Sequence, residues 1–283
     1  MGYASHSKSD VKEMLEVIGI TSLDDLFSDI PKEIQLKSPL SLPKAMSEIE
    51  LDLLMHDIAS KNGSVISFAG AGSYNHHVPA VVDHLASRSE FYTAYTPYQP
   101  EVSQGTLTAI FEYQTMLCRL TGMDVANASM YDGATALAES VLMSTRVTDR
   151  KKIIISDTLH PHYRDVLKTY AWANGITIAE TQSTDGLSDY DMMTSMIDDS
   201  TSAIVIQSPN FFGIIENYQQ LSDSAHSKKV HLIHVTTEAL SLALLKTPAS
   251  LGADIFCGEG QSFGNYQGFG GPGLGILAAK ESF

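Results

Sequence analysis

The sequence predicts an α/β protein folded as a three-layer α/β/α sandwich. Short apolar runs, each about the length of one buried strand, recur through the second half of the chain, and helical segments long enough to act as crossovers separate most of them. Strands spaced in this way form a mostly parallel sheet, because parallel neighbours need long connections. The 283 residues, 43% of them hydrophobic, can bury a sizeable core.

The opening segment, residues 1–62, is predicted to be a helical arm. Apolar residues at helical spacing between Val11 and Ile18 indicate a first helix, and Ser47–Glu50 forms a capping box ahead of a later one. We expect this later helix to end with Gly63 in the left-handed conformation. Prolines interrupt the segment, which favours an extension that lies on a surface, of the kind that often clasps a partner.

The large domain is predicted over residues 63–283. It opens with the stretch Val65–Gly105, whose glycines, prolines and aromatic residues predict irregular structure, and a long amphipathic helix then runs from Leu107 to a stop at Gly122. The apolar runs that predict strands are 125–128, 153–155, 176–179, 203–206, 232–235, 255–257 and 274–278. The helices predicted between them are 136–144, 161–173, one within 188–197, and 218–227.

Charge and composition exclude several classes of function. The chain has 33 acidic and 18 basic residues, a formal net charge of -15, so we expect neither nucleic acid nor an anionic membrane as partner. No apolar run approaches the roughly 20 residues that span a bilayer, and the start has no apolar signal region. Cys118 and Cys257 lie in apolar stretches without metal-ligand spacing. We therefore expect buried free thiols, no metal site, and a soluble protein of the cytoplasm.

Two constellations directly follow predicted strands. Asp132–Ala136 opens a helix after a strand, where backbone N–H groups could hold a phosphate, although close packing alone also requires small residues at such a turn. His160 follows the strand 153–155 at its carboxyl end, where α/β proteins gather their ligand sites. Its ring could stack on a flat cofactor, or it could simply be a helix-start residue bonded to the backbone.

Two further stretches are dense in unusual residues. Gly258–Gly273 carries many glycines after a strand, which suggests a tight backbone path near a ligand or a neighbouring chain. Tyr92–Gly105 is packed with tyrosines, amides and prolines. Prolines stiffen such a loop and would present its side chains in fixed positions for recognition, while a well-bonded buried loop is the alternative.

Long strings of residues also resemble a known family. The string Phe91–Gly105, read FYTAYTPYQPEVSQG, resembles the two-subunit form of the glycine cleavage system P-protein, and specifically its subunit 1. The likeness extends over essentially the whole chain. The other stretches that resemble this family are Phe27–Pro31, Ser87–Glu90, Leu120–Met123, Ala126–Ser129, Gly258–Ser262 and Gly270–Pro272.

The resemblance implies the large domain of the pyridoxal-phosphate (PLP)-dependent transferase fold, aspartate-aminotransferase-like and called fold type I. In that fold a lysine forms a Schiff base with the cofactor, an acidic residue contacts its pyridine nitrogen, a ring stacks on it, and a loop binds its phosphate. The corresponding positions here are Gly133, Ala134 and Thr135 for the phosphate loop, His160 for the ring, and Gln261 for the lysine. The acid position falls on Thr236–Thr237, with Thr236 as the expected site residue, and the acidic residue Glu238 comes about one residue late. Because an amide has no nucleophilic amine, the resemblance implies no covalent PLP and no catalytic residue in this chain alone.

The cofactor is instead expected in a partner, subunit 2, within an α2β2 heterotetramer. The implied reaction of this glycine dehydrogenase (decarboxylating) takes glycine and the oxidised lipoyl group of H-protein to CO2 and the aminomethyl-dihydrolipoyl form. Residues expected to complete the partner's active site, with Tyr95, Tyr98 and Gln99 foremost, are Tyr95, Pro97, Tyr98, Gln99, Glu101, Ser103 and Gln104. Family members continue into a smaller carboxyl-terminal domain that lies beyond Phe283.

Two alternatives remain open at this point. A regulatory or scaffolding protein could retain the fold without the enzyme, which the missing lysine would explain. An independent PLP enzyme would need another lysine, and Lys152 and Lys168 are the ones near predicted strand ends. We expect both of these side chains to lie on solvated surfaces.

Overall fold

The computed structural model describes residues 6–63, 65–96, 98–271 and 273–283. The chain divides into two units, Met1–Ile66 and Ser67–Phe283. No helix in the described ranges is long and apolar enough to cross a membrane.

The first unit holds three short helices: α1 (Lys8–Ile18), the 3-10 helix η1 (Leu23–Phe27) and α2 (Glu48–Ser60). The predicted capping box starts α2, where the Ser47 N–H donates to the Glu50 carboxylate at 2.7 Å. The prediction for its end is wrong, because the cap of α2 is Lys61, two residues early and right-handed, and Gly63 has no positive φ. None of the three helices buries a residue.

The second unit begins with helices that the sequence did not predict. Within the supposedly irregular stretch lie α3 (Ala80–Ala86), α4 (Ser89–Tyr92) and η2 (Pro100–Val102). The fixed φ of Pro79 favours the start of α3, but one or two turns are too short to leave a clear period in the sequence. The predicted long helix is α5 (Gln104–Thr121), and it ends at Gly122 with φ 74° as expected.

A seven-stranded sheet in the order β1-β7-β6-β5-β4-β2-β3 forms the centre of this unit. Strands β2 to β6 run parallel, while β7 pairs antiparallel with β6 and β1. All seven predicted runs form strands. Their bounds are β1 (Val125–Ala126), β2 (Lys152–Ser156), β3 (Thr177–Thr181), β4 (Thr201–Gln207), β5 (His231–Thr236), β6 (Ile255–Glu259) and β7 (Gly275–Ala279).

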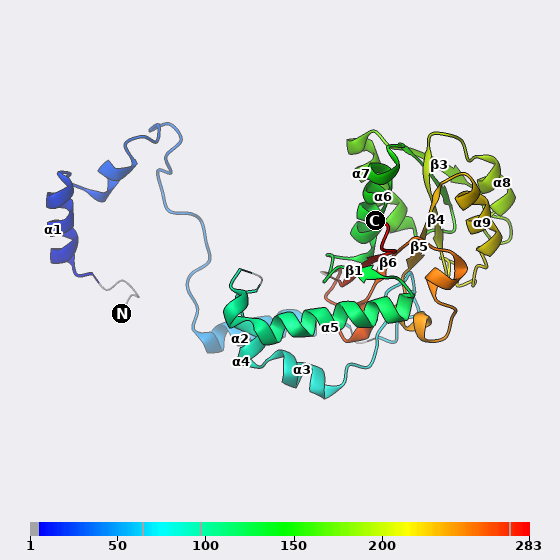
Figure 1. The fold of residues 1–283 in the computed structure, drawn as a ribbon. Helices are drawn as coiled ribbons and strands as arrows, with labels where there is room; N and C mark the ends of the chain where they lie inside the picture. Colours follow the sequence, from blue (N-terminus) through cyan, green and yellow to red (C-terminus); the bar gives the residue numbers. More distant parts are fainter. Residues whose placement is uncertain (1–5, 64, 97, 272) are drawn as a thin grey trace. The chain divides into compact units, whose positions relative to one another are not determined.

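Helices cover both faces of the sheet, as Figure 1 shows. Helices α6 (Gly133–Thr148) and α7 (Pro161–Asn174) pack on one face, and α5, α8 (Tyr190–Ser195) and α9 (Gln219–Ser227) pack on the other. Along β2, Ile153 and Ile155 belong to the α6 side and Ile154 to the α9 side. The predicted three-layer sandwich is confirmed. Short 3-10 helices η3 (Ala239–Ala243), η4 (Pro248–Leu251) and η5 (Gln261–Phe263) follow β5 and β6.

Candidate functional site

A cavity of about 350 Å³ lies where β2, β5 and β6 end and α6 begins. We call it the His160 cavity. Of the predicted cofactor positions, Gly133, Ala134, His160 and Gln261 line it. The fold therefore brings together residues from three parts of the chain that are far apart in the sequence.

The start of α6 is closed by its own cap. Asp132 Oδ1 accepts the Thr135 N–H at 2.7 Å, and the Thr135 hydroxyl donates back to the Asp132 carbonyl at 3.0 Å. Thr135, predicted as part of a phosphate loop, thus turns its hydroxyl into the cap and does not line the cavity.

Glu259 supplies a carboxylate to the same helix start. Its Oε2 accepts the Gly133 N–H at 3.0 Å, while its Oε1 accepts the N–H groups of Gln261 at 3.0 Å and Leu274 at 2.7 Å. The sequence prediction did not single out Glu259. Strand alternation could have found it, since Ile255 and Cys257 face α6 and the second residue after Cys257 must face it too.

Both ring nitrogens of His160 form hydrogen bonds. Nε2 lies 2.7 Å from the Ala71 carbonyl oxygen, which can only accept, and Nδ1 accepts the His162 N–H at 3.1 Å. Burial, more than any neighbouring charge, lowers the pKa of this imidazole. Because Nδ1 accepts a hydrogen bond and Nε2 faces an acceptor, these contacts match the neutral ring with its proton on Nε2.

The backbone of Gly72 lies against this ring. A Cβ atom at Gly72, where φ is +79°, would stand 3.3 Å from His160 Cδ2 and 3.5 Å from Thr237 Cβ. The segment thus contacts the histidine and the end of β5 together, which is where the resemblance places a flat cofactor ring.

Thr236 does not belong to the cavity, contrary to the sequence prediction. Its hydroxyl donates to the Ser208 carbonyl at 3.1 Å and lies 2.8 Å from His234 Nε2. Complete burial lowers the pKa of His234 to about 3, and Tyr218 Oη contacts its Nδ1 at 2.7 Å. Alternation along β5 explains the error, because residue 236 faces the same side as 234, and Thr237 lines the cavity instead.

Gln261 stands at the predicted lysine position and engages its amide locally. Its side-chain Nε2 donates to the Asn265 carbonyl, and its backbone N–H donates to Glu259. The nearby acid Glu238 lies outside the lining of the cavity and pairs with His76 Nε2 at 2.9 Å.

The tyrosine-rich loop lies at a different cavity, of about 560 Å³, lined in part by Tyr95, Gln99 and Ser103. Its described lining shares no residue with that of the His160 cavity. Tyr95 and Tyr98 are 60% and 76% exposed, with ring centroids 5.3 Å apart. The other predicted members differ in setting: Glu101 and Gln104 are exposed, Ser103 is 3% exposed, and Pro97 lies outside the described residues.

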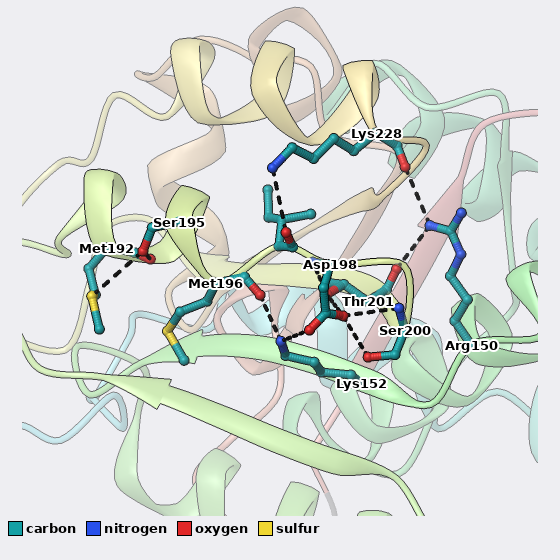
Figure 2. A network of polar contacts seen from close by, with 10 residues as sticks. Arg150, Lys152, Met192, Ser195, Met196, Asp198, Ser200, Thr201 and Lys228 are labelled. Carbon is teal, nitrogen blue, oxygen red and sulfur yellow. Dashed lines mark hydrogen bonds and ion pairs between the residues drawn. The ribbon is translucent and has the colours of Figure 1, made fainter.

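Neither alternative lysine reaches the His160 cavity. Lys152 begins β2, at the opposite end of the strand from His160, and Figure 2 shows its Nζ held by Asp198 at 2.6 Å and by the Met196 carbonyl at 2.7 Å. The hydrogen bond from Lys152 holds the pKa of the Asp198 carboxyl well below its usual range. Lys168 lies on α7 with its Nζ 4.0 Å from Glu180.

Remaining polar groups offer no metal centre. Among the residues that the structure covers, no three His, Cys, Asp or Glu side chains are arranged to hold a metal ion. Both cysteines are free. Cys257 is buried as expected, whereas Cys118 is only half-buried.

Comparison with known proteins places these features in a family. The family model described as "Glycine cleavage system P-protein" matches residues 1–283. The chain is 50% identical, over 99% of its length, to the "Probable glycine dehydrogenase (decarboxylating) subunit 1" of Carboxydothermus hydrogenoformans. It is also 50% identical, over 98% of its length, to the protein of that name from Lysinibacillus sphaericus. It covers 64% and 62% of these relatives, and so spans less than two thirds of their length.

Comparison with solved structures leads to the same family. A crystal structure of inhibitor-bound glycine decarboxylase (P-protein) of the glycine cleavage system superposes with a TM-score of 0.89 at 44% identity, over 100% of this chain and 63% of that one. The sphingosine-1-phosphate lyase of Burkholderia pseudomallei shares the fold alone, with a TM-score of 0.64 at 14% identity, over 89% of this chain and 63% of that one. The predicted transferase fold is confirmed. The chain therefore belongs to the glycine cleavage system P-protein family.

Proposed function

We propose that this chain is the subunit of a two-subunit glycine decarboxylase that carries no cofactor, and that PLP resides in a partner, subunit 2. The observation that carries the proposal is Gln261 at the lysine position, with its amide bonded to the Asn265 carbonyl. The two lysines considered as replacements, Lys152 and Lys168, lie away from the cavity. The family and the 44% identity to a P-protein support the same reading.

In the partner, PLP would act as the electron sink for the carbanion left when glycine loses CO2. This chain would contribute the tyrosine-rich loop. Tyr95, Tyr98 and Gln99 are exposed on a loop stiffened by prolines, as side chains that reach a neighbouring active site must be. Buried Ser103 would support the loop from within, while Glu101 and Gln104 remain available on its surface.

The proposal includes a role for the arm, residues 1–62, as a clasp on the partner. In the described part of the first unit, none of its helices buries a residue, and apolar side chains such as Val17 and Ile49 are 84% and 74% exposed. Apolar surface of this extent gains free energy only when another surface covers it.

The full assembly would be an α2β2 heterotetramer in the cytoplasm that passes the aminomethyl group to lipoylated H-protein. The free thiols of Cys118 and Cys257 suit a reducing compartment. The large domain over residues 63–283 would provide the fold that the partner recognises, and the smaller carboxyl-terminal domain of the family would lie beyond it.

The experiment is reconstitution with a homologous chain that has lysine at the position of Gln261. We expect the two chains to copurify, and the pair, with PLP and lipoylated H-protein, to exchange labelled CO2 into the carboxyl group of glycine. Each chain alone should be inactive. Exchange by this chain alone would contradict the proposal, and copurification without exchange would favour the regulatory or scaffolding alternative.

A further inference from the structure

The His160 cavity has the outline of a PLP site, but its residues do not fit the cofactor. A site of this kind needs a lysine amine, free N–H groups at a helix start for the phosphate, and a free face of a ring. Gln261 removes the first of these. The N–H groups at the helix start are already bonded to a side chain of the chain itself, and the edge of the His160 ring is bonded to its backbone.

Glu259 occupies the position at the start of α6 where the phosphate of PLP would bind. A phosphate at the start of α6 would have to bind the Gly133 N–H, and this donor already points at Glu259 Oε2 at 3.0 Å. The same carboxylate also takes the N–H groups of Gln261 and Leu274. It therefore meets the two requirements that a helix start places on an anion, negative charge and hydrogen-bond acceptance.

Binding a second anion beside the Glu259 carboxylate would be unfavourable in free energy. A phosphate would be brought against the carboxylates of Glu259 and of Asp132, whose Oδ1 is bonded to the Thr135 N–H at 2.7 Å. Like charges within a few ångströms repel strongly in a partly buried site.

Backbone groups of the chain also contact the His160 ring. The carbonyl of Ala71 holds His160 Nε2 at 2.7 Å, and Gly72 packs against both His160 and Thr237. These backbone groups hold the Nε2 edge of the His160 ring. The Gln267 amide, which donates to Ser73 Oγ at 2.7 Å, ties the segment to the glycine-rich stretch.

We propose that the His160 cavity is a cofactor site that no longer fits PLP, because the Glu259 carboxylate takes the place of the cofactor's phosphate at the start of α6. Glu259 then links three segments by accepting a hydrogen bond from each: the start of α6, the start of η5, and the residue that precedes β7. A bound cofactor would otherwise help to hold these segments together. The cavity rejects PLP and inorganic phosphate whether or not a lysine is present. This inference does not depend on which partner the chain binds.

The test is thermal unfolding of the full chain with inorganic phosphate, with PLP, or with potassium chloride at equal ionic strength. Wild-type protein should show the same Tm in all three. In Glu259→Ala the three N–H donors lose their acceptor, so its Tm should be lower in chloride and should recover by about 3 °C or more in phosphate, because a ligand of the folded state stabilises it.

Glu216→Ala is the matched control. Glu216 is 2% exposed and also accepts a backbone N–H, that of Ser188 at 3.2 Å, but it caps no helix. This variant should lose stability without gaining a response to phosphate. A specific phosphate or PLP shift in wild-type protein would overturn the inference, and so would a folded Glu259→Ala with the Tm of wild type.

Glu259→Gln covers the case in which the alanine variant does not fold. Glutamine keeps the volume of the side chain but turns an amide NH2 toward backbone donors, so its Tm should fall below that of wild type. A Tm equal to that of wild type would show that the charge at this place is not needed, and would contradict the proposal.

Discussion

Gly133→Ala tests the packing at the start of α6. A Cβ atom there would lie 2.0 Å from Tyr163 Oη and 2.9 Å from the Glu259 backbone nitrogen, both closer than real contacts allow. Tyr163 is 8% exposed in the core beside α6 and cannot swing away freely. Overpacking of this kind costs about 1–3 kcal/mol, and alanine recovers at most about 1 kcal/mol as the better helix residue. Because a 2.0 Å contact is severe, we take the upper end of this range, about 3 kcal/mol, and expect a net loss of about 2 kcal/mol, or about 6 °C in Tm for a domain of this size.

Two further variants make the result specific. Removal of the hydroxyl in Tyr163→Phe should reduce the cost of Gly133→Ala by about 1 kcal/mol, without abolishing it, since the backbone of Glu259 remains in the way. Gly105→Ala is the control, because nothing lies within 4 Å of a Cβ at Gly105 in α5. It should leave the Tm unchanged or slightly raised. Calorimetry that finds Gly133→Ala as stable as wild type would refute the reasoning.

The remaining predictions concern pH and the tyrosine-rich loop. Burial lowers the pKa of His234 from 6.5 to about 3, so the unfolded chain binds its proton first, and stability should fall as pH drops below 6.5, by about 2 kcal/mol at pH 5. Denaturant titrations should show a shallower fall in His234→Gln, and an unchanged slope would contradict this account. In the reconstituted pair, Tyr98→Phe should slow CO2 exchange about tenfold, the equivalent of about 1.4 kcal/mol, with association intact. Tyr131→Phe, at a tyrosine 79% exposed outside the loop, should have no effect, and equal rates for both variants would count against the loop.

The sheet could be predicted because its strands are buried on both faces. A run such as Ile153–Ile155 is apolar at every position, which is the pattern expected of a strand covered on both faces. The end of α5 at Gly122 was also predictable, since a left-handed cap favours glycine. Helix α3 was not, because seven residues with a proline before them do not establish a helical period.

The sequence could predict where the site lies but not which contacts its residues make. His160 and Gly133 each follow a strand, so the shared edge of a parallel sheet brings them together. Alternation along β6 indicates that Glu259 faces α6, but its bond to the Gly133 N–H joins residues far apart in the chain, and no local pattern encodes that contact. The choice between Thr236 and Thr237 was available from alternation along β5, because Ile233 and Val235 face α6.

The central claim is that this chain works beside a cofactor it does not hold. Its most direct test is borohydride reduction of the pair formed with a lysine-bearing partner chain in the presence of PLP, followed by mass spectrometry of both chains. The account predicts the pyridoxyl mass on the partner's lysine and on no lysine of this chain. A pyridoxyl group on Lys152, Lys168 or any other lysine here would contradict it.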